Sequence, residues 1–151
     1  MIYLPHAARV LCVVYFGWKA IPGLYLAELW GPILVAQEAY NIDLWIPSAI
    51  SVLSVPFALI TLEYFGFPLG KTQDSPLNKR NYKHVGLITM VSAFFNALFV
   101  NTYLFLVHQN FPQTDADIIQ VLRFFIGDMV GAAIVFAMLT IFLRPILVVK
   151  R

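Results

Sequence analysis

Apolar residues gather into five segments that are separated by short polar stretches. The segments run from about residues 5–18, 20–37, 45–67, 84–108 and 118–143. A transmembrane α-helix needs about 20 consecutive apolar residues, and each of the last three segments provides that length. The pattern therefore predicts an all-α fold, a polytopic transmembrane helical bundle.

The N-terminal part of this pattern is less regular. A helix over residues 5–18 would be about 21 Å long, shorter than the membrane hydrocarbon core of about 30 Å. Gly17 and Pro22 then interrupt the apolar run, so this helix is either re-entrant or interfacial, or a tilted half-span. The second segment contains Pro32, which favours a kink. We expect four full spans plus one short or re-entrant N-terminal helix, in a single integral membrane domain of residues 1–151.

The composition supports a membrane protein and excludes other classes. Of the 151 residues, 60% are hydrophobic and only 12% are charged, about half the ~25% typical of soluble domains. Mean hydropathy is +0.78. Cys12 is the one cysteine, so no internal disulfide can form. The net charge of +2 comes from basic residues at segment ends, which is typical of membrane topology and gives no reason to expect nucleic-acid binding.

The distribution of charge between the loops predicts an orientation. Seven of the ten Lys and Arg residues lie in the loop 70–83 or at the C-terminus, namely Lys71, Lys79, Arg80, Lys83, Arg144, Lys150 and Arg151. The loops 38–43 and 109–120 carry acidic residues and no basic ones. Because positive loops stay inside, we expect the basic loop and the C-terminus to be cytoplasmic. The setting that we expect is a bacterial cytoplasmic (inner) membrane.

The histidines and the motifs give no sign of an enzyme. His84 and His108 would lie about 36 Å apart along one helix, too far to bind one metal ion. His6 stands alone near the N-terminus, and we interpret it as interfacial. The sequence contains no nucleophile elbow, P-loop or HExxH motif. We therefore expect no catalytic residues, no metal and no cofactor.

Polar residues inside the apolar segments are the candidate functional residues, because the bilayer makes them costly. They are Asp128, Asn101, Asn96, Glu28, Ser51 and Tyr103. Thr89, Ser92, Asn96 and Tyr103 share one helical face, which predicts hydrogen bonds between helices. Ser48, Ser51 and Ser54 give the third segment a similar face.

Depth along the helices suggests how these residues meet. At about 1.5 Å per residue, Asp128 and Asn101 both lie about 10 Å below the outer ends of their spans. We expect them to meet across the antiparallel fourth and fifth spans, with Ser51, Glu28 and Tyr103 nearby. The cluster is either a polar brace that fixes the bundle or an outward-facing site for a ligand or a proton.

The fifth segment also carries a helix-packing motif. Gly127 and Gly131 form a GxxxG pattern that is followed by two alanines. Small residues at this spacing let a second helix approach closely within a membrane. We expect this face to be packed against another helix.

Short motifs along the chain resemble those of a known family. They are LPHAARV at 4–10, Gly-Trp at 17–18, Pro22, NKR at 78–80 and RFFIGD at 123–128. Together they resemble the membrane-associated sensor domains of bacterial signalling proteins. Such domains usually have more spans and are fused to a cytoplasmic output domain, often a kinase or a cyclic-dinucleotide enzyme. The resemblance therefore implies a sensor that works through a partner.

Two functions remain open at this stage. The first is a non-enzymatic integral membrane module, a sensor-like or accessory subunit that binds a partner or a small ligand within the bilayer. The alternative is a solute-binding component of a vitamin-type transporter, because the layout resembles the small substrate-binding components of energy-coupling-factor transporters. The expected partners are membrane lipid, other membrane protein subunits and a small-molecule ligand.

Overall fold

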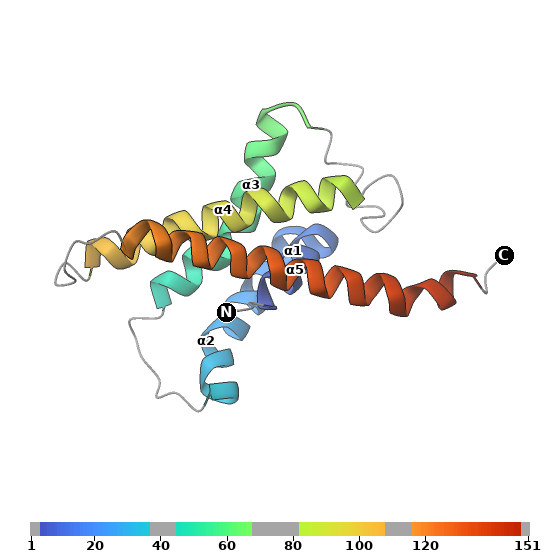
Figure 1. The fold of residues 1–151 in the computed structure, drawn as a ribbon, viewed down its shortest axis with the longest axis horizontal. Coiled ribbons are helices and arrows are strands. Elements are labelled where there is room, and N and C mark those ends of the chain that lie inside the picture. The colour runs from blue at the N-terminus through green and yellow to red at the C-terminus, as the bar shows by residue number, and fades with distance from the viewer. Residues whose placement is uncertain (1–3, 37–44, 68–81, 108–115, 149–151) are drawn as a thin grey trace.

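The computed structural model describes residues 4–36, 45–67, 82–107 and 116–148, and every regular element in these ranges is helical. The elements are α1 (Pro5–Phe16), the 3-10 turn η1 (Gly17–Ala20), α2 (Ile21–Ala36), α3 (Trp45–Tyr64), α4 (Tyr82–Val107) and α5 (Ala116–Val148) (Figure 1). This arrangement confirms the prediction of an all-α fold.

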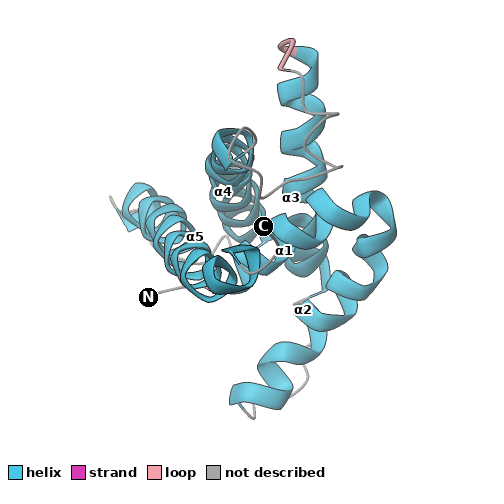
Figure 2. Ribbon diagram, turned by 90° about the vertical axis from the view of Figure 1, so that its right-hand side faces the viewer, coloured by secondary structure: helices cyan, strands magenta, loops and turns pink. Residues whose placement is uncertain are grey.

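Four segments are long and apolar enough to cross a membrane. They are Pro5–Gly31, Trp45–Tyr64, Lys83–Val107 and Ile118–Phe142. The first of them joins α1, η1 and most of α2, so the short N-terminal helix α1 belongs to one of the four candidate spans and is not an addition to them. Gly17, with a φ of 60°, is the C-cap of α1, and the chain turns through η1 into α2 (Figure 2). The sequence prediction, which divided this stretch into two segments, differs on this point.

Helix α1 occupies the centre of the bundle. It contacts α3, α4 and α5, while α2 packs against α3 and η1. Helices α4 and α5 lie side by side and antiparallel, as Figures 1 and 2 show. The apolar core joins α1, α3 and α4 through Val10, Val13, Val14, Val55, Leu62, Val85 and Ile88. Because α1 is surrounded, any polar side chain on its inner face is removed from the exterior.

The exterior of the bundle is apolar. Its exposed large side chains include Leu53, Met90, Phe94, Phe105, Ile141 and Phe142. In water such a surface would favour aggregation. In a bilayer it is compatible with the hydrocarbon, and the buried positions are then free to carry polar groups. This distribution fits the four candidate spans.

The residues behind the orientation prediction fall largely outside the described part of the chain. The structure does not describe residues 37–44, 68–81, 108–115 or 149–151. These ranges hold the acidic loops, most of the basic loop and the end of the C-terminus. The assignment of the two membrane faces thus remains a prediction from charge.

Candidate functional site

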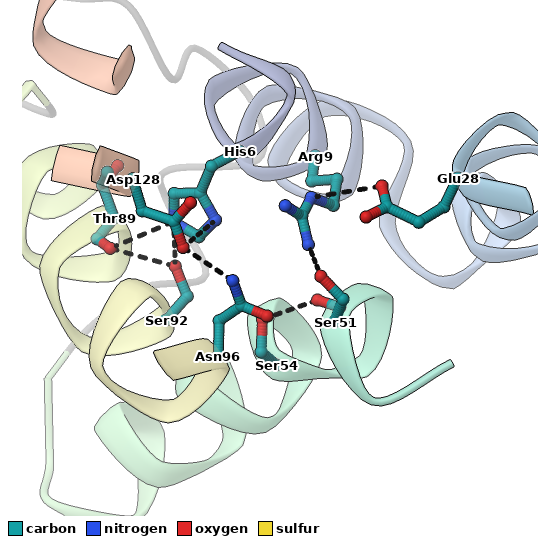
Figure 3. Close-up of polar contacts among 9 residues, drawn as sticks. All are labelled: His6, Arg9, Glu28, Ser51, Ser54, Thr89, Ser92, Asn96 and Asp128. Atoms are coloured by element: carbon teal, nitrogen blue, oxygen red, sulfur yellow. Dashed lines mark hydrogen bonds and ion pairs between the residues drawn. The ribbon is translucent and has the colours of Figure 1, made fainter. Parts of the chain in front are cut away.

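A buried polar network fills the space around α1 (Figure 3). Its members are His6 and Arg9 of α1, Glu28 of α2, Ser51 and Ser54 of α3, Thr89, Ser92 and Asn96 of α4, and Asp128 of α5. His6 and Arg9 are three residues apart and so share one face of their helix. The exposed fractions are 0% for His6, 2% for Arg9 and 1% for Asp128. Every α-helix of the described chain therefore contributes to the network, which consists of one group of contacts around His6 and one around Arg9, joined through α1.

The imidazole of His6 connects α1 to α4 and α5. Its Nδ1 atom is 3.6 Å from Oδ2 of Asp128. Its Nε2 atom is 3.2 Å from Oγ of Ser92 and 3.4 Å from the carbonyl oxygen of Thr89. Oδ2 of Asp128 also accepts a 2.6 Å hydrogen bond from Nδ2 of Asn96. The carboxyl group on α5 is thus held from α1 and from α4 at the same atom.

The guanidinium group of Arg9 connects α1 to α2 and α3. Nη1 of Arg9 donates a hydrogen bond to Oγ of Ser51. Nε of Arg9 lies 3.9 Å from Oε2 of Glu28. Ser54, one turn further along α3, donates a 2.7 Å hydrogen bond to the carbonyl oxygen of Ser51. The cation is therefore compensated by one carboxylate and positioned by one hydroxyl group.

The electrostatics of the network follow from its burial. Arg9 is the positively charged residue of the network, and Glu28 and Asp128 provide the two carboxyl groups of the network. Charges in a medium of low dielectric constant are tolerated only when they are paired or neutralised. The arrangement can brace the five elements against one another, and it can also bind a proton or a small polar ligand. Both interpretations from the sequence are compatible with this geometry.

Four of the six candidate polar residues come together in the network. Asp128, Asn96, Glu28 and Ser51 all make the contacts described above. The serine face of α3 and the Thr89–Ser92 face of α4 are buried as well. Ser92 contacts His6 of α1 and Asn96 donates to Asp128 of α5, which confirms the predicted hydrogen bonding between helices. Tyr103 is half-buried and is not among the residues in these contacts.

The expected pairing of Asp128 with Asn101 is not the one that the structure shows. The hydrogen bond to Asp128 comes from Asn96, and Nδ2 of Asn101 donates instead to the carbonyl oxygen of Ala97 at 2.6 Å. The prediction from depth along the helices alone was wrong about which asparagine bonds to Asp128. The two residues are five positions apart, which places them about 140° apart around a helix with 3.6 residues per turn. Asn101 is buried but bonds within its own helix.

The glycines of α5 lie beside the network. Gly127, Gly131 and the neighbouring Ala132 are all buried, and α5 packs against both α1 and α4. A buried small face on α5 agrees with the expected close helix packing. Gly127 directly precedes Asp128, so this packing also positions the carboxyl group.

Sequence reasoning missed the two central residues, His6 and Arg9. The sequence predicts an interfacial His6 because this histidine stands alone near the N-terminus, yet it is fully buried. The signal that could have found Arg9 is a formal charge within an apolar segment, the same signal that identified Asp128. The spacing of three residues between His6 and Arg9 would then have placed both on one helical face.

An apolar groove of about 460 Å³ opens on the α3 side of the bundle. Its lining includes Trp18, Ile50, Leu53, Phe57, Ile60 and Phe99. Ser54 also lines this groove while its hydroxyl group bonds to Ser51 inside the network. The groove and the network therefore meet on one turn of α3. Among the residues that the structure describes, no group of three or more His, Cys, Asp or Glu side chains could hold a metal ion.

Comparison with known proteins identifies no family for this chain. The resemblance of the short motifs to bacterial sensor domains therefore stays a prediction from the sequence. No protein-family model matches the chain, and neither a curated protein nor a solved structure shows a significant match.

Proposed function

We propose that this chain is a non-enzymatic module of a bacterial cytoplasmic membrane, a sensor-like or accessory subunit that binds a partner within the bilayer. The observation that carries the proposal is the charged network at the centre of otherwise apolar helices. Ionisable groups within membrane segments are rare, face the interior and commonly mark function. A purely structural core of this size could be built from apolar residues alone, and such a replacement is often neutral or stabilising.

The groove on α3 supports the proposal that the chain acts through a protein partner. Leu53 and Phe57 expose 47% and 46% of their surface there. The concave apolar surface suits a transmembrane helix of another subunit. Ser54 at this surface is one hydrogen bond from Ser51, which in turn accepts a hydrogen bond from Arg9. A partner that shifts α3 therefore acts on the network through two contacts.

Purification from native membranes in a mild detergent tests this proposal. We expect a second membrane protein to co-purify in a fixed stoichiometric ratio. Leu53→Trp should fill the groove and reduce the retained partner at least several-fold, while thermal stability remains close to that of the wild type. Met90→Trp is the matched control, because Met90 on α4 is 50% exposed and Leu53 is 47% exposed.

Two other results would count against this function. If Leu53→Trp and Met90→Trp retain the partner equally well, the groove is not the binding surface. If the chain purifies without a partner but with a stoichiometric small molecule, the solute-binding component of a transporter becomes the better interpretation. Mass spectrometry of the native complex distinguishes these cases.

The orientation of the protein can be tested independently. We expect single cysteines at Ser75 and Thr114, in a background without Cys12, to react differently with an impermeant thiol reagent on intact cells. Thr114→Cys should be labelled and Ser75→Cys should not, because the basic loop is expected inside. Labelling of Ser75→Cys alone would reverse the orientation. Both positions lie outside the described residues.

A further inference from the structure

We infer that His6 and Asp128 share one bound proton, and that this proton couples α1 to α5. The inference deepens the proposed function and rests on it, since it names the proton as the ligand of the same network. It is carried by hydrogen-bond geometry around three groups, the imidazole of His6, the hydroxyl group of Ser92 and the carboxyl group of Asp128.

The neighbours of Nε2 indicate which ring nitrogen of His6 carries a hydrogen. The single hydroxyl hydrogen of Ser92 is donated to the carbonyl oxygen of Thr89 at 3.1 Å. Oγ of Ser92 is therefore left to accept, and it lies 3.2 Å from Nε2 of His6. The Thr89 carbonyl oxygen, 3.4 Å from the same nitrogen, also can only accept. With the Ser92 hydrogen donated to Thr89, both contacts are hydrogen bonds when Nε2 carries the hydrogen.

This assignment leaves Nδ1 of His6 facing Asp128. In a neutral imidazole with its hydrogen on Nε2, Nδ1 is an acceptor. It lies 3.6 Å from the carboxyl oxygen Oδ2, which is also an acceptor and is already bonded by Asn96. Nδ1 has no hydrogen-bond partner within the described residues. Two buried acceptors that face each other are unfavourable, and one proton between them converts the contact into a hydrogen bond.

The proton completes the charge balance of the network. The titratable and charged groups that face it are Arg9 on α1, Glu28 on α2 and Asp128 on α5, in addition to His6 itself. Helices α3 and α4 contribute only hydroxyl, amide and carbonyl groups to the described contacts. With Arg9 protonated, both carboxylates ionised and His6 neutral, the network carries one net negative charge. One bound proton makes it neutral, which the low dielectric constant of the bilayer strongly favours.

The proton would act on the position of α1. An N–H···O contact normally has a length of about 2.9 Å, so the bound proton draws His6 toward Asp128 from their present separation. Without it, the two acceptors repel and the attachment of α1 to α5 weakens. Since α1 also contacts α3 and α4, the change reaches the helix that forms the groove. A proton bound within the membrane would thereby modulate partner binding.

The dependence of thermal stability on pH tests the inference with the isolated full chain in detergent. At about pH 8 the unfolded chain does not retain this proton, so unfolding releases it and stability falls as pH rises. One proton corresponds to about a tenfold change in the unfolding equilibrium constant per pH unit. We expect the melting temperature of the wild type to fall by several degrees between pH 7 and pH 9.

Asp128→Asn should abolish most of this slope. The amide group of asparagine cannot take up a proton, and the network is neutral without the extra proton. His84→Gln is the matched control, because it removes a histidine outside the network and should leave the slope unchanged. Parallel curves for the wild type and Asp128→Asn would overturn the inference.

A second measurement needs no variant and covers the case in which Asp128→Asn does not fold. Unfolding of the wild-type chain at pH 8 in a weakly buffered solution should release about one proton per chain, and a release near zero would overturn the inference. Neither experiment involves a partner. Their failure therefore leaves the partner proposal intact, and loss of the partner proposal leaves the proton count unaffected.

Discussion

Replacing Arg9 by leucine should destabilise the folded protein by about 3–5 kcal/mol, the cost typical of breaking a buried ion pair by removing one partner. Arg9 is 2% exposed and is the cation closest to Glu28 in the described network. Leucine fills part of the space but leaves the carboxylate of Glu28 without its cation in the network. It also removes the donor to Ser51. Circular dichroism recorded during unfolding in a mild detergent measures the change in the free energy of unfolding.

The double variant Arg9→Leu with Glu28→Leu separates charge from packing. If the cost arises from an uncompensated carboxylate, removal of both charges should recover most of the lost stability. Arg123→Leu is the surface control, since Arg123 on α5 is exposed, and its change in stability should stay within about 0.5 kcal/mol. A cost for Arg9→Leu no larger than that of Arg123→Leu would contradict a buried charged network.

The sequence predicts the helices and much of the network because both depend on local patterns. Long apolar runs identify the spans over α3, α4 and α5. The spacing of Thr89, Ser92 and Asn96 places them on one face of α4, and all three are buried in the structure. Asp128 stands out because a charge in an apolar run must face inward. None of these inferences requires knowledge of which helices are neighbours.

The remaining parts of the site depend on helix rotation and on the position of α1. Asn96 and Asn101 lie about 7.5 Å apart along α4 and point about 140° apart around it, and the rotation of α4 turns Asn96 toward Asp128. His6 lies near the chain start, where an interfacial position is the ordinary expectation. It is buried because α3, α4 and α5 surround α1. The spacing of His6 and Arg9 places them on one helical face, but it does not say which helices surround that face.

The second large change in stability is expected at the small face of α5, which is formed by Gly127, Gly131 and Ala132. Gly131→Leu should lower stability by about 1–3 kcal/mol through overpacking. Gly131 is buried, and α5 packs against both α1 and α4. A leucine side chain there must push a neighbouring helix away or adopt a strained rotamer. Asp128 lies three residues earlier, on an adjacent part of the same face, so the displacement should also disturb its bond with Asn96.

Gly86→Leu is the matched control for this prediction. A Cβ atom added at Gly86 would meet no heavy atom within 4 Å, and Gly86 is exposed on α4. Its replacement should change stability by no more than about 0.5 kcal/mol, or raise it slightly, since glycine is a poor helix former. The unfolding free energies of both variants are measured in the same mild detergent. Equal stability of Gly131→Leu and Gly86→Leu would show that the small face of α5 has room for a large side chain, and that close packing there does not position Asp128.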